Sequence, residues 1–169
     1  MTSLRPTLPG SAYTDPYTFD SERERIFEAN WFCAVASSDI PTPGSFRTVT
    51  VGRESVLITR SRTGEARAFL NVCRHRGSRL CPDKQGIVGN IVCPYHQWTY
   101  ELDGRLLYAR DMGPDFDATK HGLRPVACED AAGMVFICLA ETPPENSAML
   151  DAAHVARPGR HVIGAAALN

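Results

Sequence analysis

The sequence predicts an all-β domain of short antiparallel strands, preceded by one short helix. Three observations predict this fold class. Short runs rich in β-branched residues recur between residues 46 and 139, and Gly, Asp and Asn separate them at short intervals. A single segment, near the N-terminus, has the apolar spacing of an amphipathic helix. Strands of this length, joined by tight turns, pair as antiparallel neighbours.

The predicted helix covers residues 21–31. Ser21 and Glu24 have the spacing of a capping box, in which each side chain satisfies a free backbone N–H of the first turn. Residues 1–19 contain three prolines and are predicted to form an irregular arm. The apolar face of the helix is formed by Ile26, Phe27 and Trp31.

Eight strands are predicted after the helix. The fourth, 86–92, is rich in glycine, and Asp103-Gly104 gives a strong hairpin turn between the fifth and sixth. Pro143-Pro144 begins a linker, and no structure is predicted after it. The chain divides into an arm and helix (1–31), a β domain (32–142), and a linker with a loose tail (143–169). The strands are 46–51, 55–60, 66–72, 86–92, 98–102, 105–108, 126–128 and 134–139.

Charge and hydropathy exclude several classes of function. The 169 residues carry a formal net charge of −1, which gives no electrostatic basis for binding nucleic acid or an acidic membrane surface. The N-terminus lacks the apolar stretch of a secretion signal. The longest apolar run, 131–140, contains Gly133 and is too short to span a bilayer. We therefore expect a cytoplasmic protein without a membrane anchor.

Six cysteines are present, and without a secretion signal they are expected to be reduced thiols or metal ligands. Cys33, Cys128 and Cys138 lie in apolar, strand-like runs, where a small buried side chain is the expected role.

Two short loops carry a cysteine and a histidine each. They contain Cys73-x-His75 and, after seventeen intervening residues, Cys93-x2-His96. Two thiolates and two imidazoles are the ligands of a Rieske-type [2Fe–2S] cluster, with the cysteines on one iron and the histidines on the other. The same residue types also bind structural zinc, although zinc knuckles more often have C-x2-C than C-x-H spacing. A zinc-binding module therefore remains an alternative.

The flanks of these loops resemble the Rieske domain of Rieske non-haem iron oxygenases, over about residues 10–142. The residues that carry the resemblance are 71–77 (NVCRHRG), 93–100 (CPYHQWTY) and 102–104 (LDG). Gln97 replaces the glycine of most ring-hydroxylating members, and together with 109–113 (ARDMG) it is most similar to the branch that acts on quaternary amines such as glycine betaine or choline.

The resemblance implies a second domain in the parent α subunit. That domain binds a mononuclear Fe(II), which activates O2, through an H-x4-H pair and a distant carboxylate. The remaining histidines here, His121, His154 and His161, do not form such a pair. We therefore expect no oxygenation by this chain alone. The expected role is single-electron transfer from a flavin or NAD(P)H-linked reductase to an oxygenase catalytic domain. One alternative is a free-standing Rieske ferredoxin-like electron carrier. Another is a monooxygenase whose catalytic domain is supplied by further polypeptide.

The resemblance also implies the surroundings of the cluster, formed by Arg76, Tyr95, Trp98 and Tyr100. High-potential relatives have a serine hydroxyl bonded to a cluster sulfur where this chain has Trp98, which we expect to pack as an apolar lid. Tyr100 remains a candidate donor that offsets only part of this loss, and the expected reduction potential is therefore low for the class, about −150 mV.

High-potential relatives also brace the two loops with a disulfide. Here Tyr95 occupies the second-loop position, so Cys81 is predicted to be an unpaired core thiol.

Overall fold

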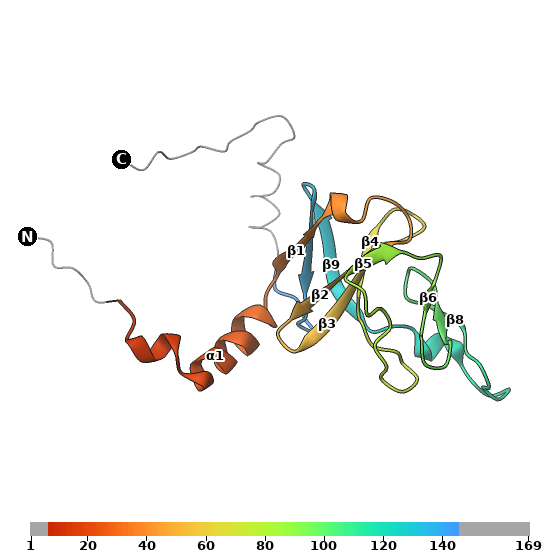
Figure 1. The fold of residues 1–169 in the computed structure, drawn as a ribbon, viewed down its shortest axis with the longest axis horizontal. Coiled ribbons are helices and arrows are strands. Elements are labelled where there is room, and N and C mark those ends of the chain that lie inside the picture. Colours follow the sequence, from red (N-terminus) through yellow and green to blue (C-terminus); the bar gives the residue numbers. More distant parts are fainter. Residues whose placement is uncertain (1–6, 146–169) are drawn as a thin grey trace, which may run out of the picture.

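The computed structural model describes residues 7–145, and it confirms the all-β prediction. Seven strands form one antiparallel sheet, in the order β1-β10-β9-β4-β3-β2-β5 (Figure 1). Their bounds are β1 Phe32–Ala36, β2 Ser45–Val51, β3 Glu54–Arg60, β4 Ala66–Leu70, β5 Gln85–Ile87, β9 Pro125–Ala131 and β10 Met134–Cys138.

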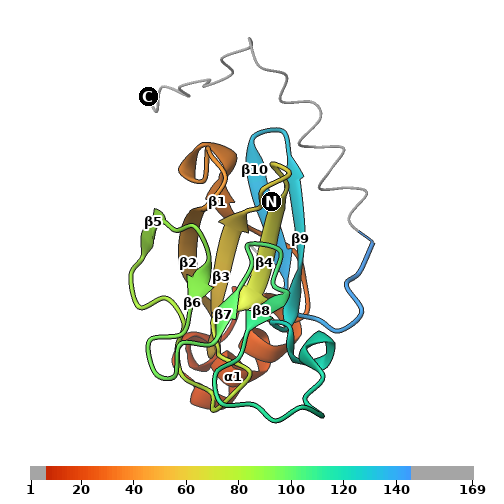
Figure 2. The same ribbon diagram turned by 90° about the vertical axis from the view of Figure 1, so that its right-hand side faces the viewer.

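A second, smaller antiparallel sheet holds β6 (Ile91–Val92), β7 (Thr99–Tyr100) and β8 (Leu106–Tyr108), in that order. Figure 1 shows this sheet at the opposite end of the molecule from the N-terminal helix, and Figure 2 shows it in front of the larger sheet. Both cysteine- and histidine-bearing loops belong to this end of the molecule.

The predicted hairpin between 98–102 and 105–108 is confirmed, with Thr99 opposite Tyr108. Its turn depends on Gly104, whose φ is +87° and whose missing Cβ would lie 2.4 Å from the ring of Phe69. Any side chain at Gly104 would therefore meet both an unfavourable backbone conformation and a packed aromatic ring. The glycine lets the small sheet sit directly against β4.

The predicted helix begins earlier than residue 21. Helix α1 spans Pro16–Glu22 and continues as a π-helical turn, Arg23–Phe27, while a 3-10 turn covers Gly10–Tyr13. The side chain of Asp15 accepts the Thr18 backbone N–H at 3.0 Å, and Pro16 occupies the first helical position. This cap-and-proline pair starts the helix more effectively than the Ser21 capping box, because proline there already has a helical φ and loses no needed hydrogen bond.

The predicted strand 86–92 is two strands, which is a second correction. Gln85–Ile87 pairs with β2 in the large sheet, and Ile91–Val92 pairs with β7 in the small one. Between them the Arg62 guanidinium donates to Gly89 O and Asn90 Oδ1 at 2.9 and 3.0 Å. The segment therefore connects the two sheets.

Apolar side chains fill both faces of the central strand β3. Val56 and Ile58 belong to one buried cluster with residues of β9 and β10, whereas Leu57 belongs to the other. The second cluster lies under the two loops and includes Cys73, Cys93, Trp98 and Tyr100. Thr59 also donates its hydroxyl to Leu102 O at 3.0 Å, which ties β3 to the hairpin. The large sheet thus supports the loops through a shared core.

The three structural cysteines differ in burial. Cys138 is fully buried as predicted, and Cys128 is half-buried, so that burial raises the pKa of its thiol to about 12. The prediction for Cys33 was wrong, because its side chain is exposed on the edge strand β1, 3.8 Å from the sulfur of Met134. Two histidines of the predicted tail, His154 and His161, lie outside the described residues. No helix within residues 7–145 is long and apolar enough to cross a membrane.

Candidate metal centre

The two loops have the same backbone frame. In the first, the Cys73 N–H donates to Ser78 O at 2.8 Å and the Gly77 N–H donates to Cys73 O at 3.1 Å. In the second, the Cys93 N–H donates to Trp98 O at 2.8 Å and the Gln97 N–H donates to Cys93 O at 3.0 Å. Each cysteine therefore begins a tight turn closed by the residues four and five positions later.

The fourth residue after each cysteine adopts the left-handed conformation. Gly77 has φ +72°, and Gln97 has φ +60°. Glycine adopts this conformation without steric cost, whereas a glutamine does so against the clash of its Cβ with the backbone. The frame is thus kept in the second loop at the cost of local strain at Gln97.

The two thiols lie close together beneath the loops. Cys73 and Cys93 are both almost fully buried, and the neighbouring Cys93 thiol is one of the smaller causes of a raised pKa at Cys73. Burial raises the pKa of the Cys73 thiol, which favours its neutral form in the absence of a positive partner. A bound metal would supply that positive charge and hold both sulfurs as thiolates.

The buried side chain of Tyr100 contacts the Cys73 thiol. Its hydroxyl lies 3.3 Å from Cys73 Sγ and accepts the Arg74 backbone N–H at 3.0 Å, so its own proton is directed to the sulfur. The side chain is fully buried, and burial raises the pKa of its phenol far above the usual value. Tyr100 therefore keeps its phenol proton and can donate it to the sulfur; that it does so when a cluster is bound stays a prediction.

The two imidazoles lie together nearer the surface. The ring centroids of His75 and His96 are 4.7 Å apart, and both side chains are partly exposed. His75 Nδ1 is buried and has no hydrogen-bond partner within the described part of the chain. Burial, with smaller contributions from His96 and Arg76, lowers the pKa of His75 and so favours the neutral imidazole that a metal binds.

Aromatic side chains enclose the imidazoles. Trp98 is 2% exposed and stacks on His75, with ring centroids 4.8 Å apart and planes inclined by 8°. It packs as the apolar lid that the sequence predicted. Tyr95 lies 3.8 Å from His96, centroid to centroid, but remains largely exposed. Trp98 therefore shields the interior, while Tyr95 extends the site towards solvent.

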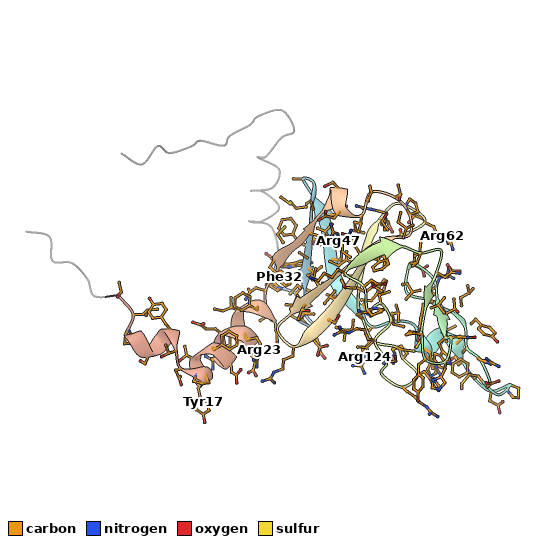
Figure 3. The ribbon with its side chains drawn as sticks, in the orientation of Figure 1. Tyr17, Arg23, Phe32, Arg47, Arg62 and Arg124 are labelled. Atoms are coloured by element: carbon orange, nitrogen blue, oxygen red, sulfur yellow. The ribbon has the colours of Figure 1, made fainter. Side chains whose placement is uncertain are left out.

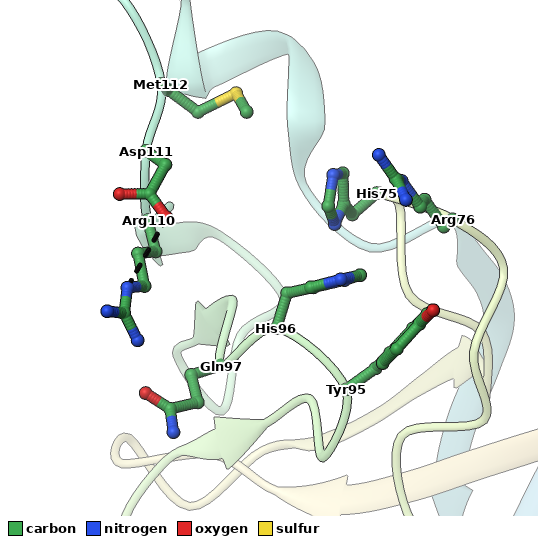
Figure 4. A pocket seen from close by; sticks show the side chains of 8 residues that line it. All are labelled: His75, Arg76, Tyr95, His96, Gln97, Arg110, Asp111 and Met112. Carbon is green, nitrogen blue, oxygen red and sulfur yellow. Dashed lines mark ion pairs between the residues drawn. The ribbon is translucent and has the colours of Figure 1, made fainter.

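An open cavity of about 370 Å³ lies in front of the imidazoles. Figure 4 shows His75 and Arg76 on one side of it and Arg110 on the other, with His96 between them. Both Arg76 and Arg110 are exposed, and Arg110 forms an ion pair with Asp111 at 3.4 Å. Gln97 and Met112 complete the rim. Solvent or a partner molecule can therefore approach the imidazole pair through this cavity.

The donor set suits a binuclear centre. The thiols form one pair in the interior and the imidazoles form a second pair at the surface, so each pair can complete one metal ion with the help of bridging ligands. Within residues 7–145 no three or more His, Cys, Asp or Glu side chains gather around a single metal position. The buried Nδ1 of His75 has no hydrogen-bond partner among the described residues, and a bound metal ion would take the place of that partner.

Cys81 lies beside the site but is held by backbone contacts. Asn71 donates from Nδ2 to Cys81 O at 2.7 Å and accepts the Cys81 N–H at 2.9 Å. Burial and the nearby charge of Asp83 raise the pKa of the Cys81 thiol to about 11, which makes the thiol unreactive at neutral pH. That Cys81 forms no disulfide stays a prediction.

Sequence reasoning missed two neighbours of Trp98. Phe116 and His121 pack edge-on against its indole, with ring centroids 5.5 and 5.8 Å away. Both come from the segment between β8 and β9, in which His121 ends a 3-10 turn, Ala118–His121, and the sequence there has no periodicity that would indicate packing. The strain at Gln97 was also missed, although its replacement of a family glycine was the available signal.

Comparison with known proteins agrees with this geometry. The family model for the Rieske [2Fe–2S] domain matches residues 30–128. A glycine betaine monooxygenase oxygenase subunit from Chromohalobacter salexigens is 50% identical over 139 residues, which are 82% of this chain and 31% of that protein. A carnitine monooxygenase oxygenase subunit from Escherichia coli K12 is 39% identical over 133 residues, 78% of this chain and 36% of that protein.

Solved structures give the same result. A quaternary ammonium Rieske monooxygenase in complex with L-carnitine superposes with a TM-score of 0.81 at 35% identity, covering 88% of this chain and 43% of that one. A naphthalene 1,2-dioxygenase with bound indole gives a TM-score of 0.72 at 34% identity, covering 80% of this chain and 32% of that one. The chain thus spans about a third of the length of the curated relatives it matches.

Proposed function

Since the chain belongs to the Rieske [2Fe–2S] domain family, whose cofactor is a [2Fe–2S] cluster, we propose that its two loops hold that cluster between them. The proposed ligands are Cys73 and Cys93 on one iron and His75 and His96 on the other. Each loop then supplies one ligand to each iron, and neither loop alone completes a site.

The observation that carries this proposal is the separation of the donor pairs by depth. Two buried thiols lie beneath two partly exposed imidazoles, and the inner nitrogen of His75 is buried without a partner. A single ion needs four ligands converging on one point, whereas a two-iron cluster needs two pairs separated by its own width.

The proposed function is single-electron transfer. A bound cluster would supply one-electron redox chemistry, and the residues around it would determine where the electron enters and leaves. Because Trp98 and the core cover the thiol side, the imidazole side facing the cavity is the proposed route. The proposed donor is a flavin or NAD(P)H-linked reductase, and the proposed acceptor is a mononuclear iron in an oxygenase catalytic domain. The proposal retains the cytoplasmic location and the domain boundaries expected from the sequence.

The substrate class also belongs to the proposal. The similar proteins are named for glycine betaine and carnitine, both quaternary ammonium compounds. We therefore propose that this domain serves an oxygenase of the same substrate class. Stopped-flow reduction of the cluster, followed by assays with glycine betaine, carnitine and an aromatic hydrocarbon in the presence of a complete oxygenase subunit, would distinguish the classes.

Analysis of the purified chain tests the cofactor and its ligands. The expected result is two irons and two labile sulfides per chain, a visible spectrum that bleaches on reduction, and an electron paramagnetic resonance signal from the reduced form only. One zinc per chain with neither iron nor sulfide would contradict the proposal and favour a structural zinc module.

A further inference from the structure

Two stacked rings in the candidate site each carry a buried nitrogen without a partner. Nδ1 of His75 and Nε1 of Trp98 are both buried, and neither has a hydrogen-bond partner among residues 7–145. The two rings come from different loops and lie against each other, with centroids 4.8 Å apart and planes inclined by 8°. A buried polar group without a partner is rare in folded proteins and indicates that a partner is missing. A metal ion accounts for the imidazole nitrogen, which leaves the indole N–H to be explained.

The other buried nitrogens without partners, among the described residues, belong to arginines. Arg23 and Arg47 each form an ion pair through another nitrogen of the same guanidinium, with Asp20 and Asp39 respectively. Figure 3 labels both arginines, one on the helical arm and one on the large sheet. Arg74 is only half-buried, and its side chain lines an open hollow. An indole has a single N–H and no second donor, so it has no such alternative.

The protein neighbours of the indole supply no acceptor. His75 covers one face of the ring, and Phe116 and His121 pack edge-on against it. Phe116 has no lone pair to offer, and Nδ1 of His121 is engaged with Asp117 O at 2.9 Å. The whole Trp98 side chain is 2% exposed, so bulk water does not reach the N–H. The group that would occupy the site beside His75 is the remaining source of an acceptor.

Resting on the proposed function, we infer that the Trp98 indole N–H donates a hydrogen bond to a sulfur of the bound cluster and thereby raises its reduction potential. The indole N–H can only donate, and the sulfurs of a reduced cluster are acceptors. The proton stays on the indole nitrogen, and no covalent bond forms or breaks. Reduction adds negative charge to the cluster, so a donor stabilises the reduced form more than the oxidised form.

This role differs from that of Tyr100. The Tyr100 hydroxyl lies 3.3 Å from Cys73 Sγ, on the thiol side of the site, whereas Trp98 stacks on His75, on the imidazole side. Trp98 then does more than cover the interior, because it supplies part of what a serine hydroxyl supplies in high-potential relatives.

Two replacements at position 98 remove the N–H and keep an aromatic ring. The first is 3-benzothienylalanine, introduced at position 98 alone, which has sulfur in place of the N–H and nearly the same shape. The second is Trp98→Phe. In equilibrium with a redox dye, each should shift the cluster towards its oxidised form by about threefold to tenfold, as expected for one hydrogen bond, where tenfold is about 59 mV in a one-electron couple.

The matched control is Trp31→Phe, at the other of the two tryptophans in the chain. The Trp31 indole N–H donates to Pro144 O at 2.8 Å, so this variant also loses an indole hydrogen bond, but outside the two loops. Its equilibrium with the dye should match that of the unmodified protein.

An isotope label gives a signature that packing alone would not produce. With ¹⁵N in the indole rings, pulsed electron paramagnetic resonance of the reduced protein should detect one indole nitrogen with an isotropic coupling, because spin density passes through a hydrogen bond to sulfur. The coupling should persist in Trp31→Phe and be absent from Trp98→Phe.

The outcomes separate the inference from the proposed function. If the cluster assembles, but the equilibrium is unchanged in both position-98 variants and no isotropic indole coupling is found, the inference is wrong and the electron-transfer function stands. A shift in Trp98→Phe without one in the benzothienyl variant would also overturn it, since ring shape would then set the potential. An equal shift in Trp31→Phe would do the same. A chain that assembles no cluster would overturn both.

Discussion

The first and second loops share one backbone frame and differ in almost everything else. Both begin with a buried cysteine and close through the same two backbone hydrogen bonds, and both reach a left-handed residue four positions later. They differ in ligand spacing, since the histidine follows the cysteine by two residues in the first loop and by three in the second. The first loop carries three arginines, and the second carries Tyr95 and Trp98.

This difference shows which features the site requires. The frame fixes the position of each cysteine, and it tolerates either glycine or glutamine at the left-handed residue. The histidine spacing is free to vary because the turn itself, rather than a regular helix or strand, directs each ring. The remaining positions then differ between the loops: Trp98 of the second loop stacks on His75, and the first loop carries three arginines.

The largest effect is expected from removing either imidazole. His75→Ala and His96→Ala should each abolish the cluster, because the outer iron would lose half of its protein ligands. The measurement is iron and sulfide content together with the visible spectrum. His121→Ala is the control, since His121 packs on Trp98 but is not a proposed ligand. Full cluster content in either variant would show that the replaced histidine is not a required ligand.

The next effect concerns the left-handed glycine of the first loop. Gly77→Ala should lower the free energy of unfolding by about 1–2 kcal/mol, because an alanine Cβ is unfavourable at positive φ. A Cβ at Gly77 would meet no atom within 4 Å, so the cost is conformational and not steric crowding. Gly89→Ala is matched to it, with equally open space but no positive φ. Denaturant unfolding of both variants with the cluster bound should show a larger loss of unfolding free energy for Gly77→Ala than for Gly89→Ala. Equal losses would refute the claim that the loop frame requires a left-handed residue at position 77.

A smaller, one-sided effect is expected from Tyr100, whose hydroxyl bonds only the first loop. Tyr100→Phe should lower the reduction potential by about 20–60 mV, the equivalent of one hydrogen bond of roughly 0.5–1.5 kcal/mol in a one-electron couple. Protein-film voltammetry measures it, with Tyr108→Phe as the exposed control. For the unmodified protein we expect about −150 mV. A clearly positive potential would show that donors other than Tyr100 dominate.

The smallest effect should have the opposite sign. Gln97→Gly should raise the free energy of unfolding by about 0.5–1 kcal/mol, because it relieves the strain of a side chain at φ +60°. The same denaturant experiment measures it. A destabilised variant would mean that contacts of the Gln97 side chain at the cavity rim outweigh its backbone strain.

The sequence was most informative where chemistry restricts the residue type. The Asp103-Gly104 turn and the burial of Trp98 could both be predicted, because few residues satisfy those positions, whereas the ligand set stays a prediction. It was least informative where tertiary contacts decide between local options. Ser21 and Asp15 are both good helix caps, and the proline after Asp15 decided between them.

Other errors have a similar origin. Residues 86–92 are apolar enough for one strand, but nothing in their pattern marks the change of sheet between Ile87 and Ile91. Cys33 lies in an apolar run, yet β1 is an edge strand and its alternation turns that side chain to solvent. The contacts of Phe116 and His121 with Trp98 join segments about twenty residues apart without any local signal.

The central claim is that two imidazoles, one from each loop, bind the same iron. Pulsed electron paramagnetic resonance of the reduced protein, labelled with ¹⁵N-histidine, tests it most directly. The account predicts two inequivalent, strongly coupled histidine nitrogens in a [2Fe–2S] signal. A cluster signal with fewer than two coupled histidine nitrogens would contradict it.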